Sequence, residues 1–117
     1  MPRGVQETVR RVQEQLLEIA FEWQAVQGMD ESSEKAALQR AFIQKLKEPC
    51  STIHRIENEF HRTVQQIELI IEKMAFERDS QRKIEELRDI LFQIQLEHVQ
   101  LNRVRNACVK LHASLQK

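Results

Sequence analysis

The chain has 117 residues, of which 41% are hydrophobic and 31% are charged, and its formal net charge at pH 7 is zero. This length corresponds to a single domain that can bury a core without help from metals or disulfide bonds. The balanced charge argues against a protein that coats nucleic acid, and no apolar run is long enough to span a membrane. Without an apolar leader, the protein is expected to be intracellular, in the cytoplasm or nucleus.

The first predicted helix covers about residues 5–27. Its apolar residues recur at intervals of three and four positions, the pattern of a coiled-coil seam. This seam consists of Val5, Val9, Val12, Leu16, Ile19, Trp23 and Val26. Gly28 is suited to end the helix in a left-handed conformation. The next helix can be capped by Asp30, Ser32 or Ser33.

The second predicted helix covers about residues 33–77 and contains Pro49. Proline removes a backbone donor and clashes with the preceding turn, so a break is expected there. The apolar period nevertheless continues past it at intervals of seven, through Leu46, Ile53, Phe60, Ile67 and Met74. We therefore predict one long element that is kinked or broken at Pro49, with four helices in total as the alternative.

Seven consecutive polar residues, 77–83, predict a turn with Asp79 or Ser80 as the cap of a third helix over about residues 81–115. A continuous helix with a stutter in its heptads is the alternative. Three long helices joined by short turns alternate in direction. The predicted fold is all-α: a single domain over residues 1–117 that forms an elongated antiparallel three-helix bundle or coiled coil.

The sequence contains no pattern that predicts catalysis. Its two glycines cannot form a phosphate-binding loop, and no zinc-protease motif or Glu-x-x-His pair occurs. We therefore expect no enzyme activity, no small-molecule substrate, no metal and no other cofactor.

One pattern of Cys and His residues has three interpretations. Cys50 and His54 are four residues apart on the second helix, and Cys108 and His112 have the same spacing on the third. If the hairpin turns near residue 79, the two cysteines lie at the same level. They are then buried free thiols, a disulfide formed under oxidation, or half of a tetrahedral zinc site. Free thiols are the preferred interpretation.

All three helices carry large apolar residues away from their seams. Such residues either widen the core contacts or form an exposed patch that marks an interface. We predict that they bind a partner: Leu17, Phe21, Leu69, Phe76, Phe92, Leu96 and Val99.

Charge is distributed unevenly along the chain. No acidic residue follows Glu97, and the basic residues beyond it are Arg103, Arg105, Lys110 and Lys117. They complement the dipole at the end of a helix, or they dock an acidic partner, and we include the first three among the predicted partner-binding residues. The first helix carries a stripe of like charges that faces either solvent or such a basic surface: Glu14, Glu18 and Glu22.

These observations predict a non-catalytic subunit of a larger coiled-coil complex, in which a second apolar face on the first and third helices docks helices of other subunits, in a homo- or hetero-oligomer. One alternative is a self-contained monomeric adaptor that binds a peptide helix. The others are a membrane-surface or nucleic-acid binder that uses the basic segment, and a Cys/His metal or redox protein.

Overall fold

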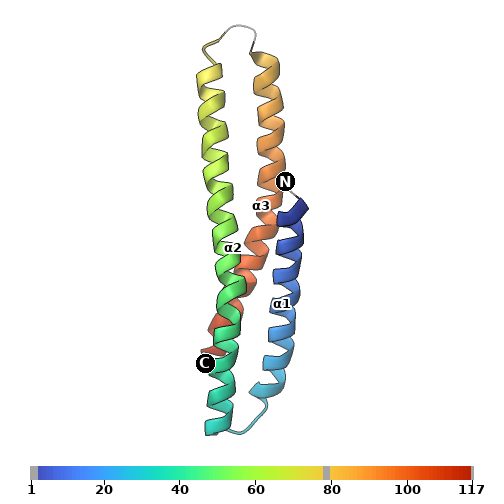
Figure 1. The fold of residues 1–117 in the computed structure, drawn as a ribbon, viewed down its shortest axis with the longest axis vertical. Helices are drawn as coiled ribbons and strands as arrows, with labels where there is room; N and C mark the ends of the chain where they lie inside the picture. Colours follow the sequence, from blue (N-terminus) through green and yellow to red (C-terminus); the bar gives the residue numbers. More distant parts are fainter. Residues whose placement is uncertain (1–2, 78–79, 117) are drawn as a thin grey trace.

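The computed structural model describes residues 3–77 and 80–116. It contains three helices, α1 (Arg3–Gln27), α2 (Ser33–Met74) and α3 (Gln81–Leu115). α1 runs parallel to α3 and antiparallel to α2 (Figure 1). The predicted all-α bundle is confirmed, and the molecule measures 71 × 20 × 16 Å. Its radius of gyration is 19.9 Å, against about 13 Å for a compact domain of this length, so a large share of its surface is exposed.

α2 continues through Pro49, whose side chain is buried. Proline has no N–H to donate to the carbonyl of Lys45 one turn earlier, so the helix lacks one hydrogen bond there. Burial of the neighbouring Leu46 and Ile53, which are 2% and 1% exposed, compensates for this loss. The predicted alternative of a broken α2 and four helices is therefore wrong.

The turn between α1 and α2 follows only part of the sequence prediction. Gly28 does not adopt a positive φ, so the predicted left-handed end of α1 is wrong. The turn is instead closed by the N–H of Met29, which donates to the carbonyl of Val26 at 3.0 Å. Ser32 is the cap of α2, and its hydroxyl accepts a hydrogen bond from the N–H of Lys35 at 3.1 Å.

The turn between α2 and α3 is tied to the end of α2. The Ser80 hydroxyl donates to the carbonyls of Met74 and Glu77, at 2.6 and 2.9 Å. Ser80 therefore precedes α3 without capping it through its side chain. Asp79, the other predicted cap, lies outside the described residues. Because α2 ends at Met74 and α3 begins at Gln81, the alternative of one continuous helix is wrong.

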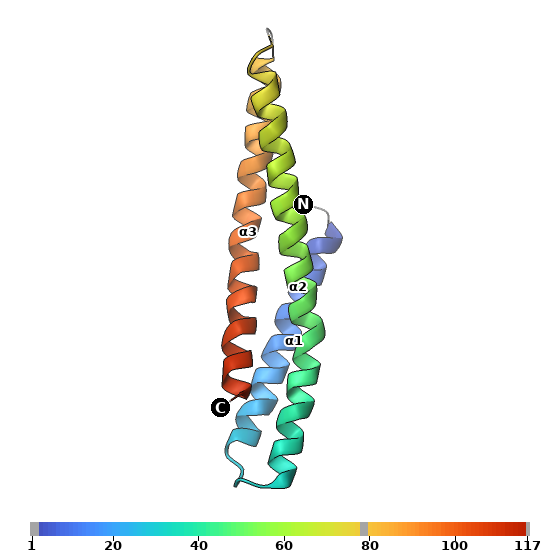
Figure 2. The ribbon, with the colours of Figure 1, turned by 90° about the vertical axis from the view of Figure 1, so that its left-hand side faces the viewer.

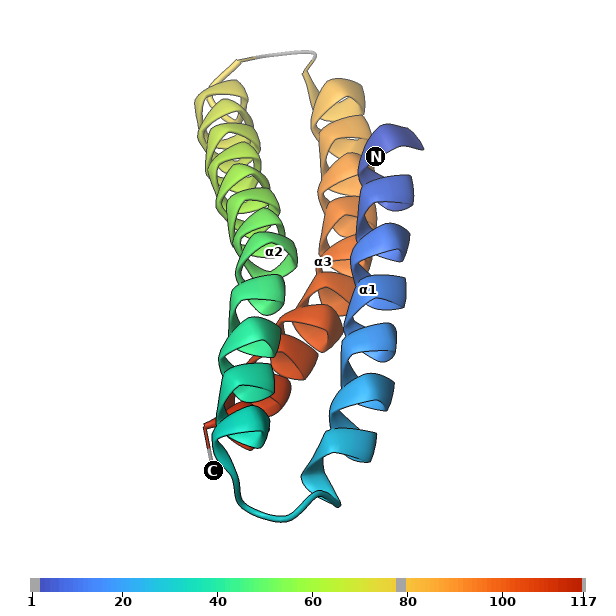
Figure 3. The same cartoon turned by 60° about the horizontal axis from the view of Figure 1, so that its bottom comes forward.

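The core lies at the end of the molecule where all three helices meet (Figure 3). The Trp23 ring packs edge-on against Phe42 of α2, with 5.9 Å between the ring centroids. Its indole N–H donates to the Ser114 hydroxyl of α3 at 3.2 Å, so one side chain joins three helices. The buried cluster around it is Val9, Val12, Leu16, Ile19, Trp23, Phe42, Leu46, Ile53, Ile56, Leu101, Val104, Cys108 and Leu115.

We expect Leu101→Ala to lower the free energy of unfolding by about 2–5 kcal/mol, because it opens a cavity in this cluster. Leu101 is 1% exposed, whereas Leu17 is 71% exposed. Leu17→Ala is therefore the matched control, with an expected change within about 0.5 kcal/mol. Urea denaturation followed by circular dichroism measures both, and equal losses would contradict the assigned core.

Candidate interaction surface

α1 covers only one end of the hairpin formed by α2 and α3 (Figures 1 and 2). Trp23 fixes the alignment through its contacts with Phe42 and Ser114, so Arg3 lies level with about residue 62 of α2 and about residue 94 of α3. Beyond that level, residues 62–74 and 81–94 continue as two helices for roughly 20 Å. We call these residues the open segment.

The apolar seam of the open segment remains partly exposed. Ile84, at 6% exposure, is the one buried apolar residue within residues 62–74 and 81–94. The other seam positions are only half-buried: Val64, Ile67, Ile71, Met74, Leu87, Leu91 and Ile94. Two packed helices bury one strip of each, and a third helix is needed to cover the remainder.

Two isoleucines show how the absence of a third helix at this level changes the exposure of a side chain. Ile70 of α2 occupies the same heptad position as Phe42 and Ile56, which are 7% and 5% exposed, yet Ile70 is 46% exposed.

In α3, Ile90 occupies the same heptad position as Val104, which is 2% exposed, yet Ile90 is 50% exposed. The residue types are equivalent, and the difference is that α1 does not extend to this level.

In the rest of the hairpin, α1 packs against one side of α2 and α3. The apolar residues of the open segment on that same side form what we call the uncovered strip: Ile67, Ile70 and Met74 of α2 with Leu87, Ile90 and Ile94 of α3. The sequence analysis placed Ile67 and Met74 in the seam of the second helix and did not predict an uncovered strip. The exposure could have been inferred from the predicted helix lengths, because a first helix about half as long as the second cannot cover all of it.

All seven apolar residues predicted to lie off the seams are exposed: Leu17, Phe21, Leu69, Phe76, Phe92, Leu96 and Val99. Leu17 lies beside Arg103 in a surface groove of about 450 Å³ between α1 and α3, which Ala20 and Ala107 also line. Phe92, Leu96, Val99 and Arg103 follow one another at intervals of four, three and four, so they share one face of α3.

We call Leu17, Phe21, Phe92, Leu96 and Val99 the outer face. Leu69 and Phe76 are seven residues apart on α2 and do not belong to it. The predicted second apolar face on the first and third helices is thus exposed, whereas the two α2 residues form a separate exposed pair.

The predicted charged residues have different surroundings. Arg105 Nη1 lies 3.4 Å from Glu57 Oε2 of α2, so this arginine is paired within the chain. Arg103 shares its groove with Glu14, one member of the acidic stripe. Glu22 lies 3.7 Å from Lys45 of α2 and not beside the basic residues of α3. Lys110 is exposed.

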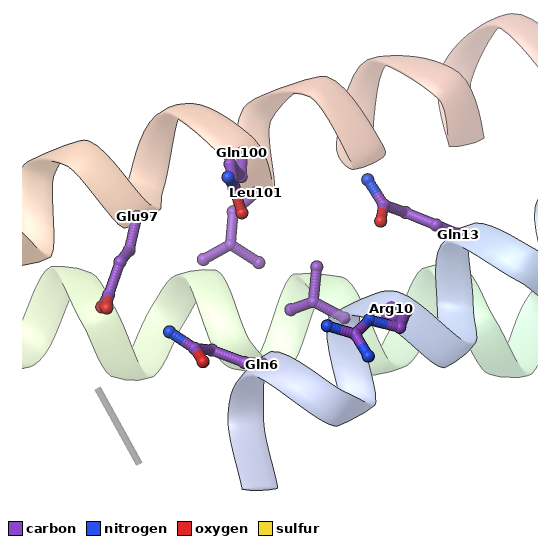
Figure 4. A pocket seen from close by; sticks show the side chains of 7 residues that line it. Gln6, Arg10, Gln13, Glu97, Gln100 and Leu101 are labelled. Atoms are coloured by element: carbon purple, nitrogen blue, oxygen red, sulfur yellow. The ribbon is translucent and has the colours of Figure 1, made fainter. Parts of the chain in front are cut away.

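A second crevice between α1 and α3, about 380 Å³ in volume, is lined mainly by polar side chains. Figure 4 shows the ends of Gln6, Arg10, Gln13 and Glu97 around this space, with Leu101 pointing into it. α1 contacts α2 more extensively than it contacts α3.

The Cys and His residues meet only in part. Cys50 and Cys108 line one groove between α2 and α3, which also includes His112. Among the described residues, no three His, Cys, Asp or Glu side chains gather closely enough to hold a metal ion. The arrangement thus brings the thiols together without completing the tetrahedral zinc site considered from the sequence.

Comparison with known proteins identified no matching family model, curated protein or solved structure. None of the helices within residues 3–77 and 80–116 is long and apolar enough to cross a membrane. The interaction surface is therefore interpreted from its own geometry.

We expect backbone amides in residues 64–74 and 84–94 to exchange with deuterium faster than those in residues 46–56 and 101–111. The open segment lacks a third helix, so local opening exposes less buried apolar surface there. Hydrogen exchange followed by mass spectrometry measures the difference on the chain diluted until it is monomeric, so that no second copy covers the open segment. Equal protection along both helices would contradict this account of the open segment.

Proposed function

We propose that the protein is a non-catalytic subunit of a larger helical assembly, and that a helix of a partner chain packs along the uncovered strip. The main support is the difference in side-chain exposure between equivalent heptad positions of one helix. In α2, Ile70 is exposed and Phe42 and Ile56 are buried; in α3, Ile90 is exposed and Val104 is buried. Each position is buried where α1 is present and exposed where it is absent. A partner helix in line with α1 would complete a three-helix cross-section along the whole hairpin.

The expected partner is an amphipathic helix of about four turns, because the open segment is roughly 20 Å long. Covering one half-exposed Leu or Ile recovers on the order of 1 kcal/mol. The strip contains two half-exposed isoleucines, Ile70 and Ile90, and four partly buried side chains, so its gross contribution is a few kcal/mol before the cost of association. An isolated helix of this length is marginal in water, so we expect the partner segment to be ordered by a larger structure or upon binding.

The outer face supports additional contacts in the same assembly. Leu17 of this face lines a groove that contains Arg103, and Lys110 is exposed further along α3. Apolar anchors supply affinity, and charges at their edge favour one register of docking. A partner helix with acidic residues beside its apolar stripe fits this combination.

A self-contained adaptor that binds one peptide helix is the second candidate. It is favoured by the cluster that joins all three helices through Trp23, since such a cluster allows the chain to fold alone. The two candidates differ in what the isolated chain does in solution.

We expect the isolated chain to have a solution mass above the 13.9 kDa of one copy, because uncovered apolar surface drives self-association. Ile70→Gln combined with Ile90→Gln should reduce the mass to that of one chain while the helical circular dichroism is retained. Size-exclusion chromatography with light scattering measures this. Val109→Gln is the matched control, because Val109 is 62% exposed on α3 outside the open segment.

A sharp monomer peak of the unmodified chain, with full helicity, would contradict the proposal and favour the self-contained adaptor. A discrete dimer would identify a second copy as an occupant of the strip. If the double variant unfolds, the two isoleucines contribute to the fold itself, and the proposal fails in this form.

The outer face is tested separately by replacing Phe92, Leu96 and Val99 together with Gln. We expect association to weaken without loss of helicity, because each of these side chains is at least half exposed in the single chain. Unfolding of this triple variant would show that the residues stabilise the bundle instead.

A further inference from the structure

Cys50 of α2 and Cys108 of α3 lie side by side although 58 positions separate them in the chain. Both contact the buried apolar cluster, and both line the same groove between the two helices. A disulfide requires Cα atoms roughly 4.4–6.8 Å apart, so only cysteines on facing positions of two packed helices can form one. The helix register thus places two nucleophilic side chains together.

The two thiols differ in access to solvent. Both cysteines line a groove of about 440 Å³ between α2 and α3, where Cys50 is partly exposed and Cys108 is buried. The groove is largely apolar, with Ile43, Leu46 and Val109 in its lining. A reagent in solution therefore reaches Cys50 first.

The surroundings also distinguish the two thiols chemically. The hydrogen bond from the Cys108 thiol lowers the pKa of Cys50, and partial burial opposes this effect. The pKa of Cys108 is raised by the same hydrogen bond, by burial and by the negative charges of Cys50 and Glu57. Cys50 is therefore the thiol that ionises first, and Cys108 keeps its proton.

We propose that Cys50 and Cys108 form a reactive dithiol whose substrate is a low-molecular-weight disulfide, and that the product is an intramolecular disulfide joining α2 to α3. Cys50 is the attacking thiol and Cys108 the resolving thiol. The proposal does not depend on the uncovered strip, because the thiol pair lies outside the open segment.

The reaction proceeds in two balanced steps. The Cys50 thiolate attacks one sulfur of the small disulfide, forming a mixed disulfide, and the released thiolate takes up the proton lost from Cys50. Cys108 then loses its proton and attacks the Cys50 sulfur, which breaks the mixed disulfide and releases the second small thiol. Two protein thiols are oxidised, and one small disulfide is reduced to two thiols.

Oxidised glutathione provides the test on the full chain. The expected product is a monomer that has lost two hydrogen atoms, carries no glutathione and runs faster on a non-reducing gel. Cys108→Ala should instead accumulate glutathione on Cys50, and Cys50→Ser should react much more slowly because Cys108 is buried. A wild-type chain that retains glutathione, or that forms a disulfide-linked dimer, would overturn the proposal.

A displaced thiol provides the matched control. Cys108→Ala combined with Ala107→Cys moves the thiol by one position, into the groove that α3 forms with α1. This variant should bind glutathione at two sites and form no intramolecular bond, and closure at the wild-type rate would contradict the assigned geometry. Because the native bond would restrict the unfolded chain between residues 50 and 108, its formation should also raise the midpoint of thermal unfolding, reversibly on reduction.

The pH profile of alkylation separates a reactive pair from two inert thiols. The pKa of Cys50 is lowered, so its reaction with iodoacetamide should reach half of its maximal rate at a lower pH than that of an ordinary thiol. Cys108→Ala removes the donor and should move this midpoint to higher pH. Lys47 and His112 also line the groove, so Lys47→Gln and His112→Gln control for their charge. A midpoint unchanged by Cys108→Ala would contradict the pairing.

Discussion

When two helices pack along their length, each buries only the side chains that face the other. The apolar side chains beside this contact stay in contact with water unless a third helix covers them. In this protein α1 supplies the third helix over only part of the α2–α3 hairpin. The buried cluster, the connection through Trp23 and the tolerance of Pro49 all belong to the covered part. The open segment has the same apolar period but lacks the partner that would bury it.

This constraint divides the molecule into a covered part and an open segment that differ in how much apolar surface they bury. The covered part holds the tertiary structure through apolar contacts, supplemented by few ion pairs of low individual value. It also places Cys50 against Cys108. The open segment contributes surface instead, since half-exposed isoleucines at seam positions gain free energy only when another helix arrives. The proposed docking involves the open segment and the proposed thiol chemistry involves the covered part, so the two can be altered separately by mutation.

The candidate surface was predictable only in part. The off-seam residues Leu17 and Phe92 follow from helical periodicity, and both are exposed as an interface requires. Ile70 and Ile90 could not be distinguished from core residues by pattern, because a heptad position reports which way a side chain points and not what lies opposite it. The pairing of Arg105 with Glu57 likewise depends on how two helices are aligned.

The sequence by itself determined the three helices, their bounds within a few residues and the level at which the cysteines meet, because these follow from local periodicity, polar turns and chain length. It also suggested an interruption at Pro49 and a left-handed Gly28, two local preferences that the fold does not follow. Only the tertiary structure decided which seam positions are covered. That outcome depends on the level of the hairpin at which α1 begins, a relation in space that no local pattern encodes.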